Sequence, residues 1–164
     1  MKEAFKMLLL IDMERCTDCR LCELACSYRK EGVFNPSRSR VRVISWPEIG
    51  RGMPIMCQQC EEAPCISVCP TRAIYKAPVN AFLIDEGACI GCKLCMQVCP
   101  FGAISIDPET RKLIKCDLCE GDPACVRLCP QEAILYVKES HAAMKKGLWL
   151  REALTTLIKP TGKR

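Results

Sequence analysis

Apolar and polar residues alternate over short stretches of this chain, a pattern typical of short β-strands. Residues 40–46 alternate basic and apolar side chains, which predicts a half-exposed strand. Pro47 and the glycine-containing segment 50–52 are expected to end it. A last strand is predicted at residues 133–137.

Two hairpins are predicted in the middle of the chain. Residues 75–84 contain the segment 77–80, whose proline and asparagine suit a turn between two short strands. Residues 104–114 repeat this plan, with the turn at 107–110. The central part of the chain is therefore expected to be built from small antiparallel units.

The C-terminal segment follows a helical period instead. Apolar or small residues recur at helical spacing between a plausible N-cap, Ser140, and the helix-breaking Pro160. They are Ala143, Gly147, Leu150, Leu154 and Leu157. Three roles remain open for this amphipathic helix, namely packing on its own domain, docking to a partner subunit and binding a membrane surface. Membrane binding is the least favoured of the three, because this segment contains only one tryptophan, Trp149, to anchor it in a lipid surface.

All sixteen cysteines fall into four groups of four. The third group has spacers of two, two and three residues and is followed by Pro100, which is the bacterial ferredoxin ligand run for iron–sulfur clusters. A proline also follows the last cysteine of the second and fourth groups, whereas Ser27 follows that of the first. The groups are Cys16, Cys19, Cys22, Cys26; Cys57, Cys60, Cys65, Cys69; Cys89, Cys92, Cys95, Cys99; and Cys116, Cys119, Cys125, Cys129.

Two internal repeats accompany these groups. The sequence Leu-Ile-Asp precedes the first and third groups with the same spacing, ending at Asp12 and Asp85. The pair Ala-Ile follows each Cys-Pro after two further residues, at positions 73, 103 and 133. We expect the two aspartates to form turns at the entry to the cysteine loops, and each Ala-Ile to begin a strand.

Disulfides and zinc are the alternatives to iron–sulfur clusters. Disulfides need an oxidising compartment, and the start of the chain shows no signal-peptide pattern. Structural zinc usually takes cysteine pairs separated by a longer loop, not four cysteines within one short run. With no apolar stretch long enough for a membrane span, a cytoplasmic iron–sulfur protein is predicted.

The formal charge of +5 describes the chain without its cofactors. Each oxidised cubane with four thiolates carries about −2, so four of them bring the net charge to about −3. A nucleic-acid partner is therefore not expected. The basic stretch of residues 29–51 is interpreted as a solvated face or as a docking surface.

No catalytic centre is predicted. The one histidine, His141, lies at the start of the tail helix and is expected at the surface. No phosphate-binding loop or flavin fingerprint is present. Lys93 and Lys115 lie beside cysteines and could tune a redox potential, but ordinary surface lysines are the preferred interpretation.

The pairing of the groups is open from spacing alone. In two-cluster ferredoxins, the fourth cysteine of each run ligates the other cluster. Groups one and two could pair, followed by three and four; alternatively, the second and third could pair inside the first and fourth. The gapless repeat that links groups one and three favours the nested arrangement.

Over about residues 8–137 the four groups resemble the four-cluster electron-transfer subunits of molybdenum and tungsten enzymes, such as the beta subunits of dimethyl sulfoxide reductase and formate dehydrogenase. In compactness the chain is similar to the small subunits of tungsten aldehyde oxidoreductases or benzoyl-CoA reductases. The resemblance implies four [4Fe–4S] clusters with nested ligation. Their ligands would be Cys16, Cys19, Cys22 and Cys129; Cys116, Cys119, Cys125 and Cys26; Cys57, Cys60, Cys65 and Cys99; and Cys89, Cys92, Cys95 and Cys69.

The fold expected from this resemblance is α+β, with tandem bacterial-type 2[4Fe–4S] ferredoxin folds, one nested inside the other. Residues 1–52 and 105–138 would form the outer domain, 53–104 the inner domain and 139–164 the helical tail. The implied function is non-catalytic electron transfer between a larger catalytic subunit and a flavoprotein or ferredoxin. A freely diffusing polyferredoxin, a subunit of a formate dehydrogenase or hydrogenase complex, and self-association through the tail remain alternatives.

Overall fold

The computed structural model describes residues 7–139, which form eight short strands and four α-helices. The strands pair into four separate two-stranded antiparallel sheets. The elements are small because most of the chain between them is taken up by the cysteine loops. The predicted tail helix lies outside the described residues.

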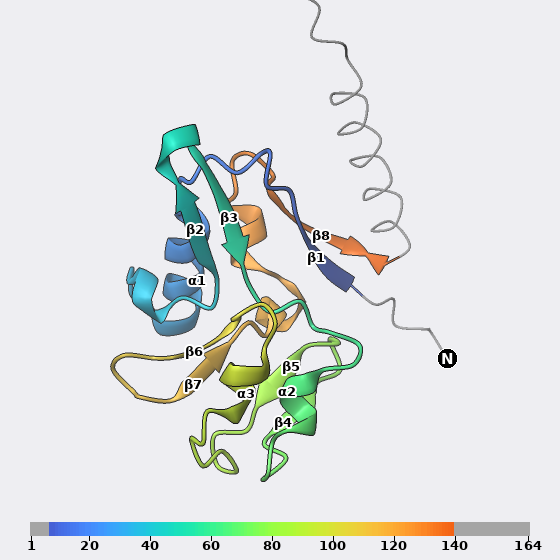
Figure 1. Cartoon of the computed structure of the whole chain (residues 1–164). Coiled ribbons are helices and arrows are strands. Elements are labelled where there is room, and N and C mark those ends of the chain that lie inside the picture. Colours follow the sequence, from blue (N-terminus) through green and yellow to red (C-terminus); the bar gives the residue numbers. More distant parts are fainter. Residues whose placement is uncertain (1–6, 140–164) are drawn as a thin grey trace, which may run out of the picture.

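The first sheet joins the two ends of the described chain. β1 (Met7–Ile11) and β8 (Ile134–Lys138) are antiparallel, with Met7 opposite Lys138 and Ile11 opposite Ile134. The sequence pattern predicted β8 but not β1. Figure 1 shows these first and last segments in one half of the molecule, with the green and yellow middle of the chain in the other half.

The second sheet lies beside the first cysteine loop. β2 (Arg42–Trp46) confirms the predicted strand and pairs with β3 (Arg51–Ile55). β3 was not predicted because Gly52 and Pro54 are poor strand residues. Both are nonetheless buried, and a Cβ on Gly52 would lie 2.7 Å from Cγ1 of Val43, so only glycine lets the hairpin close here.

The two predicted hairpins are both confirmed. β4 (Ile74–Lys76) pairs with β5 (Phe82–Ile84), and β6 (Ile104–Ile106) pairs with β7 (Leu113–Lys115). As expected, the strands β4, β6 and β8 each begin at the isoleucine of a Cys-Pro-x-x-Ala-Ile segment. In the β6–β7 turn, Oδ1 of Asp107 accepts the N–H groups of Glu109 and Thr110, which fixes an Asx turn.

Each helix carries the third cysteine of its group. The helices are α1 (Leu21–Glu31), α2 (Pro64–Ser67), α3 (Leu94–Val98) and α4 (Ala124–Arg127). The residues before α1 and α3, Arg20 and Lys93, occupy equivalent places in the repeat and have φ of 56° and 64°. This left-handed turn lets the chain reverse between the second and third cysteines.

The buried side chains form two clusters. One contains Leu9, Val41, Met56 and Ile134 with cysteines of the first and fourth groups, and Cys57 packs against it. The other contains Ile74, Phe82 and Ile104 with Cys65 and Cys95. Within residues 7–139, no helix is both long and apolar enough to span a lipid bilayer.

Candidate iron–sulfur centres

A first hollow brings the two ends of the chain together at four cysteines. Cys16, Cys19 and Cys22 line it from the loop after β1 and from α1, and Cys129 lines it from the loop before β8. The β1–β8 sheet holds this arrangement, and the N–H of Asp12 extends it by donating to the carbonyl of Ala133 at 2.8 Å.

Two further hollows lie in the other half of the molecule. Cys89, Cys92 and Cys95 line one together with Cys69. Cys57, Cys60 and Cys65 line the other together with Cys99. Each hollow thus combines three cysteines of one group with the fourth cysteine of another.

The fourth set is more deeply buried. Cys116, Cys119, Cys125 and Cys26 all lie in the interior. Cys26 belongs to the same buried cluster as Cys116 and Cys125. Contacts between α1, which carries Cys26, and α4, which carries Cys125, hold this set together.

In three of the groups, the last cysteine accepts the same kind of local hydrogen bond. The N–H groups of Ala73, Ala103 and Ala133 donate to the Sγ atoms of the cysteines four residues earlier, at 3.3, 3.4 and 3.2 Å. The residue before each alanine has a positive φ, which turns the following N–H back toward the sulfur. The repeated Cys-Pro-x-x-Ala sequence therefore places an N–H donor next to the cysteine sulfur.

Cys26 obtains its donor in a different way. Because Ser27 replaces the proline, α1 continues past Cys26 to Glu31. The buried Oγ of Ser27 accepts the N–H of Asn35 at 3.1 Å and anchors the returning loop. The N–H of Arg40 then reaches the Sγ of Cys26 at 3.3 Å.

Neighbouring sets approach one another through particular cysteines. Cys22 and Cys125 belong to one buried cluster, against which Cys57 packs. Gln59, two residues after Cys57, donates to the carbonyl of Cys116. Cys65 and Cys95 belong to the other cluster. These contacts favour a single line of four sets.

The two ends of this line reach the surface. Among the sixteen cysteines, Cys19 and Cys92 are the two that are exposed. They occupy equivalent positions in the repeated first and third groups, and they belong to the first and last sets of the line.

The donor chemistry fits cubane clusters. Within residues 7–139, no three cysteine, histidine or carboxylate side chains converge on a position for one metal ion. Three of the sets surround hollows, an arrangement that suits a polynuclear cluster with one thiolate for each iron.

Comparison with protein families gives two matches. Residues 51–140 match the 4Fe-4S dicluster domain, and residues 13–29 match a 4Fe-4S binding domain. The chain belongs to the 4Fe-4S dicluster domain family. The two matches together take in all four cysteine groups, so its cofactors are four [4Fe–4S] clusters, and its fold is a small ferredoxin-like mixture of helices and strands.

Two curated relatives of this chain are subunits of iron–sulfur or electron-transfer type. The polyferredoxin-like subunit of aliphatic sulfonate oxidoreductase from Pyrococcus furiosus is 40% identical over 86 residues, which cover 51% of this chain and 49% of the relative. The thiosulfate reductase electron transfer subunit PhsB of Salmonella typhi is 33% identical over 90 residues, with 51% and 47% covered. The chain thus spans about half the length of these relatives.

One solved structure is similar to nearly the whole length of this chain. The active site complex BamBC of benzoyl coenzyme A reductase, in complex with benzoyl-CoA, contains a chain with a TM-score of 0.50 and 26% identity. The match covers 95% of this chain and 91% of that chain. The similarity therefore extends over all four cysteine groups.

Burial shapes the electrostatics of the ligand thiols. It raises the pKa of Cys22 and of Cys116 to about 12, and it raises that of Cys125 further. Burial acts in the same direction on Cys69, but hydrogen bonds from Thr71 and from the N–H of Ala73 outweigh it and lower the pKa of this thiol. The buried thiols thus ionise only when bound cations compensate the thiolate charge.

Three of the six basic side chains in the basic stretch of residues 29–51 are buried or half-buried and paired, which corrects the expectation of a solvated face for Lys30, Arg38 and Arg40. Arg38 is buried and pairs with Asp107 and Glu31, and Arg40 pairs with Glu31 at 2.6 Å. Lys30 pairs with Asp117 at 2.5 Å, next to the cysteines of the fourth group. Three residues do stay exposed as expected, namely Arg29, Arg42 and Arg51.

Two expectations about single residues are confirmed. Oδ1 of Asp12 accepts the N–H groups of Glu14 and Arg15, and Oδ1 of Asp85 accepts that of Gly87, so both aspartates form turns before their cysteine loops. Lys93 is exposed, as expected of a surface lysine.

The expectation for Lys115 was wrong, because its side chain is buried between β5 and the start of the fourth cysteine group. Next to it lies Gln59, which sequence reasoning missed. Nε2 of Gln59 donates to the carbonyl of Cys116 at 2.9 Å, and Oε1 accepts the N–H of Phe82 at 2.8 Å. Its place two residues after Cys57 gave no signal of this role.

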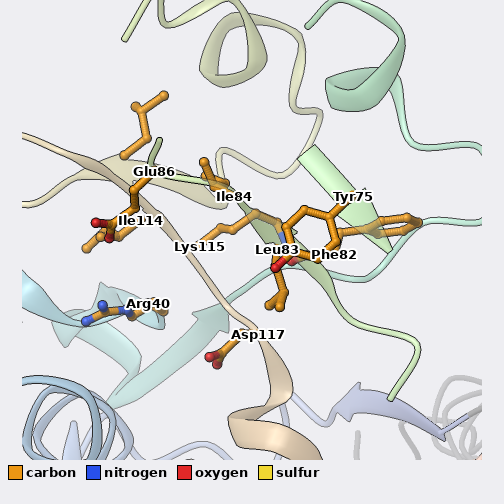
Figure 2. Close-up of a pocket in the computed structure, with 10 residues that line it drawn as sticks. Arg40, Tyr75, Phe82, Leu83, Ile84, Glu86, Ile114, Lys115 and Asp117 are labelled. Carbon is orange, nitrogen blue, oxygen red and sulfur yellow. The ribbon is translucent and has the colours of Figure 1, made fainter. Parts of the chain in front are cut away.

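A separate hollow without cysteines lies beside this buried lysine. Figure 2 shows side chains from β4, β5 and β7 around it, with Arg40 and Asp117 on further segments. Its lining mixes apolar residues of β5, such as Leu83 and Ile84, with charged ones. The side chains of Arg40 and Asp117 are already engaged by Glu31 and Lys30.

Proposed function

We propose that this chain is the non-catalytic electron-transfer subunit of an oxidoreductase complex. It would relay electrons between a larger catalytic subunit and a second redox partner, a flavoprotein or a ferredoxin. The names of two relatives support the proposal, one a polyferredoxin-like subunit of an oxidoreductase and the other an electron transfer subunit of a reductase. The [4Fe–4S] clusters supply one-electron redox chemistry when bound.

We assign the ligands in nested order. Clusters one to four would be held by Cys16, Cys19, Cys22 and Cys129; Cys116, Cys119, Cys125 and Cys26; Cys57, Cys60, Cys65 and Cys99; and Cys89, Cys92, Cys95 and Cys69. The composition of the three hollows supports the first, third and fourth sets. The packing of Cys26 with Cys116 and Cys125 in one buried cluster, and the contact between α1 and α4, support the second.

The same observations support a nested pair of ferredoxin-like domains. Residues 1–52 and 105–138 would form the outer domain and residues 53–104 the inner one. The β1–β8 sheet and the contact between α1 and α4 join the two parts of the outer domain. The contact between α2 and α3 does the same within the inner domain.

One observation carries the proposed function, namely that Cys19 and Cys92, from the two sets proposed to end the line, are exposed. A relay needs one surface-accessible ligand shell for each partner and buried ones between them. In the second set all four cysteines are buried, and in the third Cys65 is buried and the others half-buried. The chain's own residues would thus shield the second set most completely and leave one exposed cysteine at each end.

The identity of the catalytic subunit is a finer proposal. A tungsten or molybdenum enzyme is proposed because the cysteine pattern resembles that of the four-cluster subunits of such enzymes. The names of two relatives, subunits of a sulfonate oxidoreductase and of a thiosulfate reductase, support an oxidoreductase complex. A subunit of a benzoyl-CoA reductase complex is a second candidate. It is favoured by the likeness to a chain of the BamBC complex over 91% of that chain. Because the thiols must stay reduced until they bind iron, we place the protein in the cytoplasm.

Untagged purification from native cells under anaerobic conditions tests the function. The expected result is about sixteen irons per chain, four for each cluster, together with a larger co-eluting subunit that contains tungsten or molybdenum. Sixteen irons on a chain that elutes alone would make it a diffusing polyferredoxin instead. Zinc without iron would rule out electron transfer altogether.

A further inference from the structure

Lys115 is a buried cation at the junction of the two halves of the molecule. Its side chain is 6% exposed. It extends from β7 toward β5, as Figure 2 shows, and its Nζ donates to the carbonyl of Phe82. The same Nζ donates to the carbonyl of Cys116 at 3.1 Å, immediately before the second set of ligands.

Lys115 reaches the wall of the third set. Its Nζ donates to the carbonyl of Phe82, and Phe82 lines the same hollow as Cys60 and Cys65. The lysine therefore stands close enough to stabilise negative charge on these sulfurs.

No carboxylate neutralises this cation in the described part of the chain. Its hydrogen-bond partners are main-chain carbonyls. The two acidic residues of the adjoining hollow have other partners, because Asp117 pairs with Lys30 and Glu86 pairs with Lys112. A buried and uncompensated charge is screened by solvent and salt far less than an exposed one.

We propose that Lys115 raises the reduction potential at the ligand set Cys57, Cys60, Cys65 and Cys99. One electron added at this set adds one negative charge, which the ammonium group stabilises. Lys115 acts through electrostatics and is not a ligand. The inference rests on the proposed function, because it assumes clusters at these cysteines.

The position of Lys115 lets its charge influence electron transfer in the proposed relay. Lys115 adjoins Cys116 in sequence and, through Phe82, the hollow of Cys60 and Cys65, so it lies where an electron would pass between the outer and inner pairs of sets. Raising the potential on the inner side favours transfer across the junction toward the third set. Salt in the medium is expected to change this bias little.

The test compares redox titrations of the full-length holoprotein, followed by electron paramagnetic resonance. Lys115→Met removes the charge and both hydrogen bonds, whereas Lys115→Gln removes the charge but keeps a donor. Lys115→Arg keeps the charge. Lys112→Met is the matched control, since it removes a lysine charge from the same hairpin at an exposed position.

We expect both neutral variants to lower the ratio of reduced to oxidised cluster at one site at least tenfold at fixed potential, or ~59 mV for a one-electron couple. The affected signal should be the one altered by Cys60→Ser, and Lys115→Arg and Lys112→Met should leave it in place. Lys115→Gln carries the test if Lys115→Met does not fold. Unchanged potentials in a neutral variant with full iron content, or a shift in the signal altered by Cys119→Ser, would overturn the inference.

The wild-type titration separates this inference from the proposed function. Four reducible clusters in the wild type, together with an unshifted neutral variant, would refute only the role of Lys115. Fewer than four clusters in the wild type would refute the four-cluster relay itself.

Discussion

Arg38 and Asp107 form a buried ion pair that ties two distant parts of the chain together. Nε of Arg38 donates to Oδ2 of Asp107 at 2.9 Å, and the two side chains are 10% and 2% exposed. Arg38 follows α1, whereas Asp107 starts the β6–β7 turn, so the pair joins the first cysteine group to the hairpin that precedes the fourth. Nη2 of Arg38 also pairs with Glu31 at 2.6 Å.

Removing Arg38 should weaken the protein far more than removing a surface arginine. Arg38→Ala leaves the carboxylate of Asp107 buried without its cation, which is the costly way to break a buried pair. We expect a clearly lower midpoint for thermal loss of the cluster absorbance. The control is Arg127→Ala, which breaks the exposed pair with Asp122 and should cost at most about 1 kcal/mol.

Equal midpoints for the two variants would contradict this reading of the Arg38 pair. Cluster content has to be checked first by iron analysis, because a variant that never loads iron reports on assembly and not on stability. Anaerobic handling is required for both variants.

The contribution of Asp107 should depend on pH in a defined direction. Burial acts to raise the pKa of Asp107, but the N–H of Thr110, the Arg38 guanidinium and the N–H of Glu109 outweigh it and lower the pKa. A lowered folded-state pKa means that the stabilisation is complete above the unfolded pKa of about 3.9 and is lost as pH falls through the folded value.

Comparison of the wild type with Asp107→Asn at several pH values checks this. The difference in thermal midpoint should stay constant from about pH 8 to about pH 5, because Asp107 remains ionised throughout. It should shrink only below about pH 4. A difference that declines between pH 7 and pH 5 would mean that the pKa of Asp107 is raised, not lowered.

Gln59 should be needed for the junction near Lys115. Gln59→Leu keeps the approximate volume but leaves the carbonyl of Cys116 and the N–H of Phe82 without their partner. Each buried unsatisfied group costs about 1–3 kcal/mol. Gln58→Leu, the adjacent control, loses a single 3.2 Å bond to the carbonyl of Met56 at a half-buried site.

Anaerobic denaturation of both glutamine variants gives the comparison. The expected order of stability is wild type, then Gln58→Leu slightly below it, then Gln59→Leu well below both. If Gln59→Leu matched Gln58→Leu, the two hydrogen bonds of Gln59 would not hold the junction.

Local features of this fold were predictable because neighbours in sequence determine them. The hairpin turns at 77–80 and at Asp107, the Asp12 turn and the strands that follow each Cys-Pro all depend on residues within a few positions of one another. The cysteine spacing likewise identified the cofactor, since four thiolates so close together suit an iron–sulfur cluster.

Features that depend on distant residues were not predictable in the same way. β3 was missed because Gly52 and Pro54 are poor strand residues whose burial depends on packing against Val43 and the first cysteine loop. Lys115 was wrongly expected at the surface, because its Nζ donates to the carbonyl of Phe82, which is 33 residues away in the chain. The helices that carry the third cysteines are, α1 apart, four or five residues long, too short for a periodic signal.

The nested ligation is the central claim, and pairs of cysteine substitutions test it most directly. In anaerobic holoprotein, Cys16→Ser and Cys129→Ser should each alter the same one of four [4Fe–4S] resonance signals. The double variant of Cys16 and Cys129 should therefore leave three signals intact. The double variant of Cys16 and Cys26 should leave only two, because those ligands are assigned to different clusters. Two intact signals in the Cys16 and Cys129 double variant would contradict the nested assignment.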